Sequence, residues 1–205
     1  MAAVEHGQEV EQRRVPAEER RVLVERAAGR VFARDGYAGA RIDDIAAAAH
    51  VTKPIVYRHF DSKKALYMAL LEKHEQDLPS FFEAIRGRAA DAPPEELVRT
   101  ILEHWLDYVR ENQHAWLMLF RDSSGDAEIQ ALRLRVSATA REVIAAFIAE
   151  QAGERLPADQ IEPSAEALTG GLASLALWWI DHPDVPKDVL VEVGARLSTA
   201  AVAAG

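Results

Sequence analysis

Hydrogen-bond donors and positive charges gather in one short stretch of the chain. They are Thr52, Lys53, Tyr57, Arg58, His59 and Lys63. Side chains of these types bind phosphate oxygens, and a lysine can also reach the acceptor atoms at the edge of guanine. The stretch therefore indicates recognition of a polyanion.

Two short helices have to position these donors. The first carries apolar residues at helical spacing, namely Ile42, Ile45, Ala46 and Ala49. The second is expected to begin after an N-cap at Thr52, with Pro54 in the first turn, where its missing N–H is not needed. Because both are too short to be stable alone, they predict a helix-turn-helix, whose second helix can lie in a DNA major groove. With Val56 and Phe60 turned to the core, the donors face outward.

The surrounding segment, FARDGYAGARIDDIAAAAHVTKPIVYRHFDSKKAL, resembles the DNA-binding domain of the tetracycline-repressor (TetR) family of transcriptional regulators. The resemblance covers about residues 20 to 70 and is specific, because Y-x-H-F-x-S-K at this spacing after a helix-turn-helix is rarely met elsewhere. The matching residues are Phe32, Gly36, Tyr37, Ile45, Ala46, Ala49, Val51, Thr52, Tyr57, His59, Phe60, Lys63 and Leu66.

The resemblance implies a role for each donor. Lys53 and Pro54, together with Tyr57, correspond to residues that meet base edges. Contacts to the DNA backbone are implied for Tyr57, His59 and Lys63, and Thr52 would position a phosphate too. Arg58 can reach either bases or phosphates, and both alternatives stay open.

Three positions depart from the family pattern. Ala40 stands where a threonine usually caps the first helix of the motif, a loss of about 1 kcal/mol unless Asp43 compensates. His50 replaces the usual glycine of the turn and needs a positive φ there, which histidine tolerates better than most residues. Pro54 replaces another common glycine, so these positions bear on the register of the recognition helix.

Composition limits the class of protein. The 205 residues are 49% apolar and 28% charged, typical of a globular domain, and 0 cysteines exclude disulfides, a zinc ribbon and a thiol nucleophile. The first residues lack the apolar core of a signal peptide, and no window approaches the roughly 18 apolar residues of a spanning helix. We expect a cytoplasmic protein without membrane association, cofactor or bound metal.

Charge is unevenly distributed along the chain. The net charge of −9 argues against nucleic-acid binding over the whole surface. Residues 13–73 hold 13 Lys and Arg against 8 Asp and Glu, whereas residues from 76 onward hold 11 against 21. This pattern favours two surfaces with different partners, and ordinary variation among solvated helix faces is the alternative.

Helical spacing runs through the rest of the chain, and strand signals are weak. We predict an all-α fold of about nine helices, with a flexible arm (1–16), a helix-turn-helix domain (17–62) and a helical effector-binding and dimerisation domain (63–205). Residues 115–120 are apolar all round, which predicts burial on every side. Residues 157–163 are expected to form a loop, and Arg13 and Arg14 in the arm to be solvated or to enter a minor groove.

The last two helices carry more apolar surface than one core needs. Two apolar faces on the helix before residue 181 suggest a second subunit, and a four-helix dimer interface is also what the resemblance implies. A fully buried helix of a monomer is the alternative. The expected interface residues are Leu168, Leu172, Leu175, Trp179, Leu190, Val193, Leu197 and Ala201. A two-fold dimer would read a pseudo-palindromic DNA operator.

Large apolar side chains between the two ends are candidates for an effector pocket. They are Trp105, Tyr108, Trp116, Leu117, Phe120, Phe147 and Trp178, with His104 or His114 as a polar contact. Such residues line cavities for apolar or aromatic molecules, although plain core is an even alternative for any one of them. The resemblance implies an effector site here and, since such proteins mostly block promoters, repression relieved by the effector.

Two other classes of function compete with this interpretation. An enzyme has little support, because the nucleophile-elbow, dinucleotide and P-loop motifs are absent, and the single E-x-x-H from Glu111 to His114 falls short of a di-iron bundle, which needs two. A protein-interaction bundle with an unused helix-turn-helix is the second. Salt separates it from a DNA reader, whose affinity falls steeply as salt rises.

Overall fold

The computed structural model describes residues 16–88, 92–121 and 125–202, and within them it contains helices and no strands, which confirms the all-α prediction. The elements are α1 (Ala17–Gly39), α2 (Ile42–Ala48), α3 (Lys53–His59), α4 (Lys63–Arg88), α5 (Pro94–Glu111), α6 (Gln113–Phe120), α7 (Ala127–Ala152), the 3-10 helix η1 (Gly153–Arg155), α8 (Ala158–Asp181) and α9 (Lys187–Val202). The arm with Arg13 and Arg14 lies outside the described residues.

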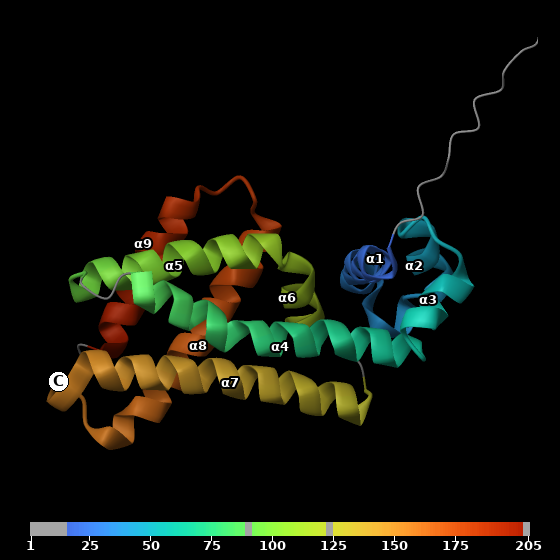
Figure 1. Cartoon of the computed structure of the whole chain (residues 1–205). Coiled ribbons are helices and arrows are strands. Elements are labelled where there is room, and N and C mark those ends of the chain that lie inside the picture. The colour runs from blue at the N-terminus through green and yellow to red at the C-terminus, as the bar shows by residue number, and fades with distance from the viewer. Residues whose placement is uncertain (1–15, 89–91, 122–124, 203–205) are drawn as a thin grey trace, which may run out of the picture.

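Helices α1, α2 and α3 form a small unit at one end of the molecule, here called the reader unit (Figure 1). The apolar stripe of α1 is its core, with Val24, Ala27 and Phe32 almost fully buried. Ile45 from α2 and Val56 from α3 complete this core and are also fully buried. The unit joins the rest through α1, which packs on α4 and α6.

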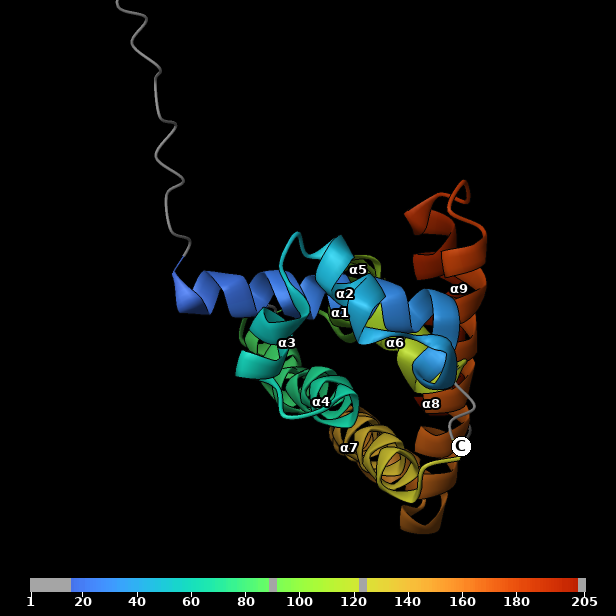
Figure 2. The ribbon, with the colours of Figure 1, turned by 90° about the vertical axis from the view of Figure 1, so that its right-hand side faces the viewer.

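Helices α4 to α9 form the remainder, here called the body. α4 and α7 lie side by side along its length and are seen nearly end-on from the reader side (Figure 2), with α8 and α9 away from α3. A second core between α5, α6, α8 and α9 buries Leu106, Trp105, Trp179 and Leu190. Helix α4 belongs to both parts, because its first turn follows the reader unit directly.

Two predictions about the body were wrong. Residues 157–163 do not form a loop, because α8 begins at Ala158 and includes Pro163. That proline removes one helical hydrogen bond, whose acceptor, the Asp159 carbonyl, lies near the exposed start of the helix, where water replaces it. Burial of 115–120 on every side also fails, since Phe120 is 40% exposed while Trp116 and Leu119 are buried.

No helix among the described residues is long and apolar enough to cross a membrane.

Candidate functional site

The turn between α2 and α3 has a defined hydrogen-bond pattern. The Val51 N–H donates to the Ala46 carbonyl at 3.0 Å and the His50 N–H to the Ala47 carbonyl at 3.1 Å. This pair of bonds is a Schellman motif, which needs a left-handed residue at its centre. His50 has φ 53°, as predicted, and within the described residues it is the one position other than glycine with a positive φ. The turn is therefore normal despite the missing glycine.

The start of α2 lies one residue later than expected. Arg41 occupies the N-cap position and makes no capping bond through its side chain, and Ala40 is buried with 2% exposure. Asp43 and Asp44 stand in the first turn, where negative charge interacts favourably with the helix dipole. The first helix of the motif thus relies on these carboxylates and on burial of Ile42 and Ile45.

The recognition helix α3 displays most of the predicted donors to solvent. Thr52 is its N-cap residue by backbone conformation, although its hydroxyl makes no capping bond. Thr52, Lys53, Pro54, Tyr57 and Arg58 are exposed, while Val56 and Phe60 on the opposite face are buried. A convex, donor-rich helix face of this kind fits a major groove.

His59 lies differently from the other donors. Its side chain is half-buried, and Nε2 is buried without a hydrogen-bond partner among the described residues. Burial lowers the pKa of His59, and the nearby Arg58 and Arg21 lower it further. The imidazole is therefore neutral near pH 7 and turned partly toward the protein.

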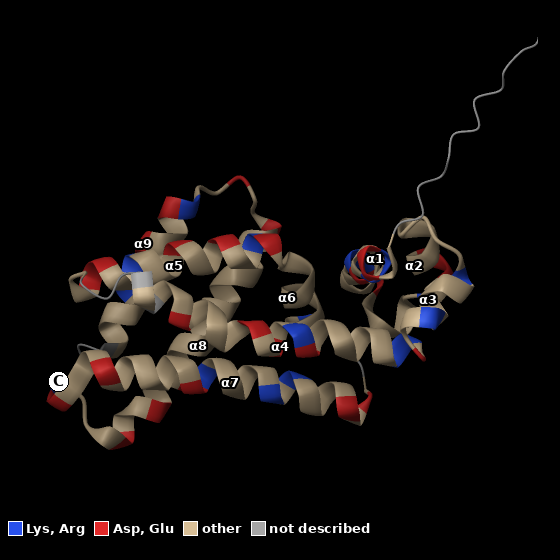
Figure 3. Ribbon diagram, viewed as in Figure 1, with Lys and Arg blue, Asp and Glu red and all other residues tan. Residues whose placement is uncertain are grey.

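Charges of both signs border the recognition helix. Lys53 Nζ forms an exposed ion pair with Asp43 Oδ2 at 3.0 Å, which holds the lysine over the gap between α2 and α3. Lysine and arginine colour the outer side of α3 and the start of α4 (Figure 3). An exposed pair of this type is worth at most about 1 kcal/mol, so Lys53 can exchange Asp43 for another acceptor.

Lys63 is turned toward the end of α1. Its Nζ donates to the backbone oxygens of Tyr37 at 2.7 Å, Ala40 at 3.0 Å and Ala38 at 3.4 Å. It also lies 4.7 Å from the centre of the Tyr37 ring. These contacts occupy the N–H groups of the Lys63 ammonium, which the resemblance implies would bind a DNA phosphate.

A cavity of about 250 Å³ opens inside the body between helices α4 to α9. Trp105, Trp116, Phe120 and Phe147 line it, as predicted. The other five candidates, His104, Tyr108, His114, Leu117 and Trp178, do not. Trp178 is 45% exposed on α8 and stacks on His182 at 4.1 Å, and the His104 ring is bonded to the Thr100 carbonyl of its own helix.

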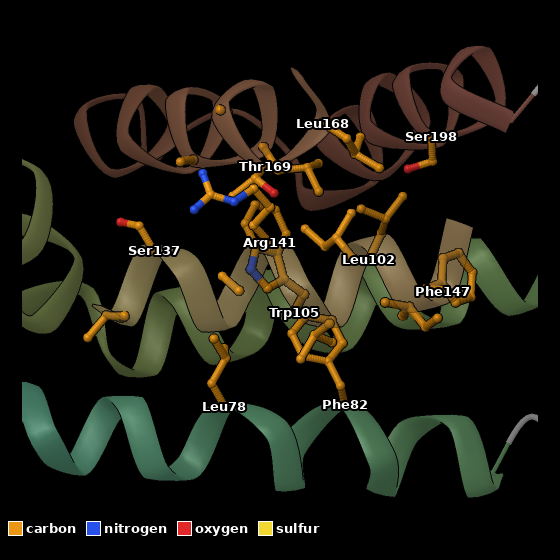
Figure 4. A pocket seen from close by; sticks show the side chains of 18 of the residues that line it. Leu78, Phe82, Leu102, Trp105, Ser137, Arg141, Phe147, Leu168, Thr169 and Ser198 are labelled. Carbon is orange, nitrogen blue, oxygen red and sulfur yellow. The ribbon is translucent and has the colours of Figure 1, made fainter. Parts of the chain in front are cut away.

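Several residues that line the cavity were missed from the sequence. Leu78 and Phe82 enter from α4, and Leu168 and Thr169 lie opposite on α8 (Figure 4). Leu168 and also Leu172 had been assigned to a dimer interface. The apolar spacing of α4 was visible in the sequence, but which of its faces meets a cavity depends on the packing of distant helices.

The polar groups of the cavity are few and mostly paired. Arg141 forms an ion pair with Glu166, and the Thr169 and Ser198 hydroxyls donate to carbonyls of their own helices. His74 shares a 2.8 Å hydrogen bond with the Tyr108 hydroxyl. The Trp116 indole N–H is buried without a hydrogen-bond partner among the described residues.

The outer face of α8 and α9 is apolar. We call Trp178, Val189, Val193 and Leu197 the exposed stripe, with exposures of 45%, 50%, 38% and 41%. Of the residues predicted for a dimer interface, Val193 and Leu197 lie in this stripe, whereas Leu168, Trp179 and Leu190 are buried inside the chain. Leu172, Leu175 and Ala201 are half-buried.

Comparison with known proteins identifies the family. Residues 26–70 match the family model of bacterial regulatory proteins of the tetR family, and residues 94–200, more than half of the chain, match a tetracyclin repressor-like C-terminal domain. The chain belongs to the TetR family. Its members are DNA-binding transcriptional regulators and not enzymes, so this protein is a transcriptional regulator.

Three known proteins illustrate the similarity. The transcriptional activator FasR of Mycolicibacterium smegmatis is 29% identical over 182 residues, covering 87% of this chain and 81% of that protein. A TetR-like regulator from Rhodococcus has a TM-score of 0.72 and 26% identity, with 94% of this chain and 100% of that chain covered. FadR from Bacillus subtilis, solved with stearoyl-CoA, shares the fold at a TM-score of 0.66 and 16% identity, with 88% and 97% covered.

Proposed function

We propose that this TetR-family protein acts in the cytoplasm as a repressor, binds a pseudo-palindromic operator as a homodimer, and releases it when a small apolar molecule enters the body. The observation that carries the proposal is the exposed donor face of α3, presented by a helix-turn-helix with a normal turn. FasR is named an activator, so the direction of regulation needs its own test.

The proposed DNA contacts divide into two kinds. Lys53, Pro54 and Tyr57 face outward at the start of α3, where a major-groove helix meets base edges. Thr52 and Arg58 flank them and are assigned to phosphates, with His59 reaching a phosphate only through its exposed edge. Phosphate contacts add affinity without preference for sequence, so specificity is assigned to the first group.

The exposed stripe supports the homodimer. Four large apolar side chains in one region of α8 and α9 are costly to leave in water, and apolar patches of this sort mark interfaces. A two-fold axis through this stripe would relate two reader units, as a palindromic site requires.

The cavity supports an effector with an apolar chain. Its α7 wall runs from Val136 to Phe147, about 16 Å at 1.5 Å per residue, which is long enough to lie along an extended chain. The FadR structure with stearoyl-CoA shows that this fold holds such a chain in one relative. We propose an acyl-chain ligand, because the residues that line the cavity are mostly apolar.

Helix α4 connects the cavity to DNA binding. It lines the cavity at Leu78 and Phe82 and begins beside the reader unit at Lys63. A ligand that binds more tightly to one position of α4 shifts the population toward that position, by no more than its difference in affinity. Operator release follows if the favoured position separates the two recognition helices from their half-sites.

Selection of bound duplexes from random DNA tests the DNA-binding proposal. The expected product is a pseudo-palindrome with half-sites spaced by whole helical turns. Binding to it should fall tens to thousands-fold over a fewfold rise in salt. An interaction bundle that does not use its helix-turn-helix would enrich no sequence and bind duplexes poorly at any salt.

Filling the cavity tests the effector proposal. Ala140→Phe places a ring in the cavity, whereas Ala146→Phe adds the same ring on the exposed side of α7. Stearoyl-CoA should release the operator from wild type and Ala146→Phe, and at least tenfold more should be needed for Ala140→Phe, measured by fluorescence anisotropy of labelled operator. Equal responses of the two variants to stearoyl-CoA would show that the effector does not bind in this cavity.

A reporter gene driven by the operator would show whether loss of the protein raises expression, as repression requires.

A further inference from the structure

Two adjacent lysines at the start of α4 bind neighbours on opposite sides. Lys63 Nζ donates to the carbonyls of Tyr37, Ala38 and Ala40 at the end of α1. Lys64 Nζ pairs with Asp126 Oδ1 at 3.0 Å and with Glu128, both at the start of α7. The first turn of α4 thus joins the reader unit to the start of α7.

The position of Lys63 has a local electrostatic cause. Helix α1 ends at Gly39, so carbonyls in its last turn lack the amide partners of a continuing helix. Such carbonyls carry partial negative charge and attract a cation. An ammonium has three protons, and three carbonyl oxygens surround this one, so its hydrogen-bonding capacity is used inside the protein.

The packing around Lys63 makes this joint rigid. Tyr67, one turn further along α4, is fully buried and packs edge-on against Tyr37 at 5.1 Å and Phe32 at 5.0 Å. Its hydroxyl donates to the Met118 carbonyl of α6 at 3.1 Å. The end of α1 is therefore held against α4 by aromatic packing and by the Lys63 ammonium together.

Lys64 provides the second half of the connection. Asp126 is the N-cap of α7 and accepts the N–H groups of Glu128 at 3.0 Å and Ile129 at 3.3 Å, so its carboxylate is fixed before it meets Lys64. The lysine lowers the pKa of Asp126, which keeps the pair charged at neutral pH. The first turns of α4 and α7, which are two of the helices that line the cavity, are thus tied together at the reader end.

We propose that Lys63 and Lys64 are positioning residues that set the orientation of the reader unit on the body and do not contact DNA. The proposal rests on the proposed function, because it concerns a dimer bound to an operator. Orientation decides the distance between the two recognition helices. The two lysines therefore control which half-site spacing the dimer accepts.

The test compares two duplexes, the selected operator and the same operator with one base pair inserted at its centre. Wild type should prefer the first by at least tenfold. In Lys63→Ala and Lys64→Ala that preference should shrink at least threefold, because the reader units are no longer held at one distance. A smaller folded fraction lowers both affinities equally and leaves their ratio unchanged, so the ratio separates positioning from simple destabilisation.

Three controls complete the design. Lys73→Ala removes an exposed lysine of the same helix and should leave the ratio unchanged. Lys63→Arg can still donate to the three carbonyls and should keep the preference within about twofold of wild type. The exchange Lys64→Glu with Glu128→Lys preserves net charge and should restore a preference that each single change weakens. This charge exchange also tests the inference if Lys63→Ala does not fold.

Salt dependence distinguishes positioning from a direct phosphate contact. If Lys63 bound a phosphate, Lys63→Ala would reduce the slope of log affinity against log salt by about 0.9 for each phosphate that the variant no longer binds. We expect the slope to stay at its wild-type value. A reduced slope with an unchanged spacing preference, or no change in either, overturns the inference. Failure of wild type to bind any duplex in dilute buffer overturns the proposed function itself, a separate result.

Discussion

At the scale of single residues, Lys53 has the contacts expected of a side chain that changes partner. It is exposed at the first position of α3 and held by Asp43 at 3.0 Å in the absence of DNA. A guanine in the major groove offers two acceptors in place of one carboxylate oxygen. The ion pair therefore orients the lysine but leaves it able to bind guanine instead, because surface pairs of this kind are weak.

Lys53→Ala should relax base preference as well as weaken binding. Removing a base contact takes away about 1–3 kcal/mol of discrimination at the base pair concerned. The measurement is a set of affinities for operators with single base-pair changes, with Lys73→Ala as the matched loss of charge. If every base pair keeps its wild-type penalty in Lys53→Ala, the lysine contacts only the DNA backbone.

His50 carries a conformational cost that glycine would not. At φ 53° an L-residue is strained by roughly 1–2 kcal/mol, somewhat less for histidine, and the side chain is exposed. His50→Gly should therefore raise the free energy of unfolding by about 0.5–1 kcal/mol, measured in urea, with operator affinity unchanged. A loss of stability would mean that the imidazole makes contacts worth more than the strain.

At the scale of elements, α4 and α5 are joined beside the cavity by a buried polar pair. His74 is 5% exposed, shares its hydrogen bond with Tyr108 and packs edge-on against Trp116 at 6.1 Å. Burial lowers the pKa of His74 to about 4 and raises that of Tyr108. The joint is therefore neutral through the physiological range, which suits a wall between apolar helices.

Acid should lower the free energy of unfolding at pH values where His74 in the folded protein is still neutral. Below pH 6.5 the unfolded chain binds a proton at His74 that the native state excludes until about pH 4, so stability falls with pH in that window. The loss at pH 5 is about 2 kcal/mol. Burial also lowers the pKa of His59 and of His114, which adds in the same direction.

Urea unfolding at pH 7.5 and pH 5.0 checks the contribution of His74. His74→Gln keeps an amide for the Tyr108 hydroxyl but cannot titrate, so it should lose about 2 kcal/mol less than wild type between the two pH values. An equal loss in both proteins would place the acid sensitivity elsewhere.

At the scale of the whole molecule, the reader unit lies at one end of the body (Figure 1), and the exposed stripe lies on α8 and α9. One chain presents one recognition helix. Two half-sites therefore need two chains, and the stripe is the surface whose burial favours their association. In the proposed homodimer, DNA affinity and dimerisation are therefore linked, even though the residues responsible are far apart.

Val193→Asp should disrupt the dimer and, through it, operator binding. A carboxylate at the centre of an apolar interface would be buried without a partner. The Val193→Asp protein should therefore remain a monomer, in which the carboxylate stays in water. Sedimentation velocity should show a shift to monomer, and operator affinity should fall at least tenfold. Leu134→Asp is the control, since Leu134 is 70% exposed on α7, outside the stripe. A dimeric Val193→Asp protein would exclude the stripe as the interface.

Local periodicity was enough to predict much of the reader unit. The burial of Ile45, Ala46 and Val56 follows from neighbours within one or two turns, because helix geometry alone fixes which residues share a face. The left-handed His50 followed from the family resemblance, which places a glycine at that position. The same short-range rule predicted that Lys53 and Tyr57 face outward. Family and function class followed from this segment.

Packing between distant helices decided the rest. Trp178 and Trp179 are adjacent and chemically alike, yet one is exposed and the other buried, because only the placement of α8 against α5 and α9 distinguishes their faces. Phe82 lines the cavity for the same reason. Lys63 reaches carbonyls more than twenty residues earlier in the chain. Periodicity shows that a face is apolar or charged, but its partner depends on the tertiary fold.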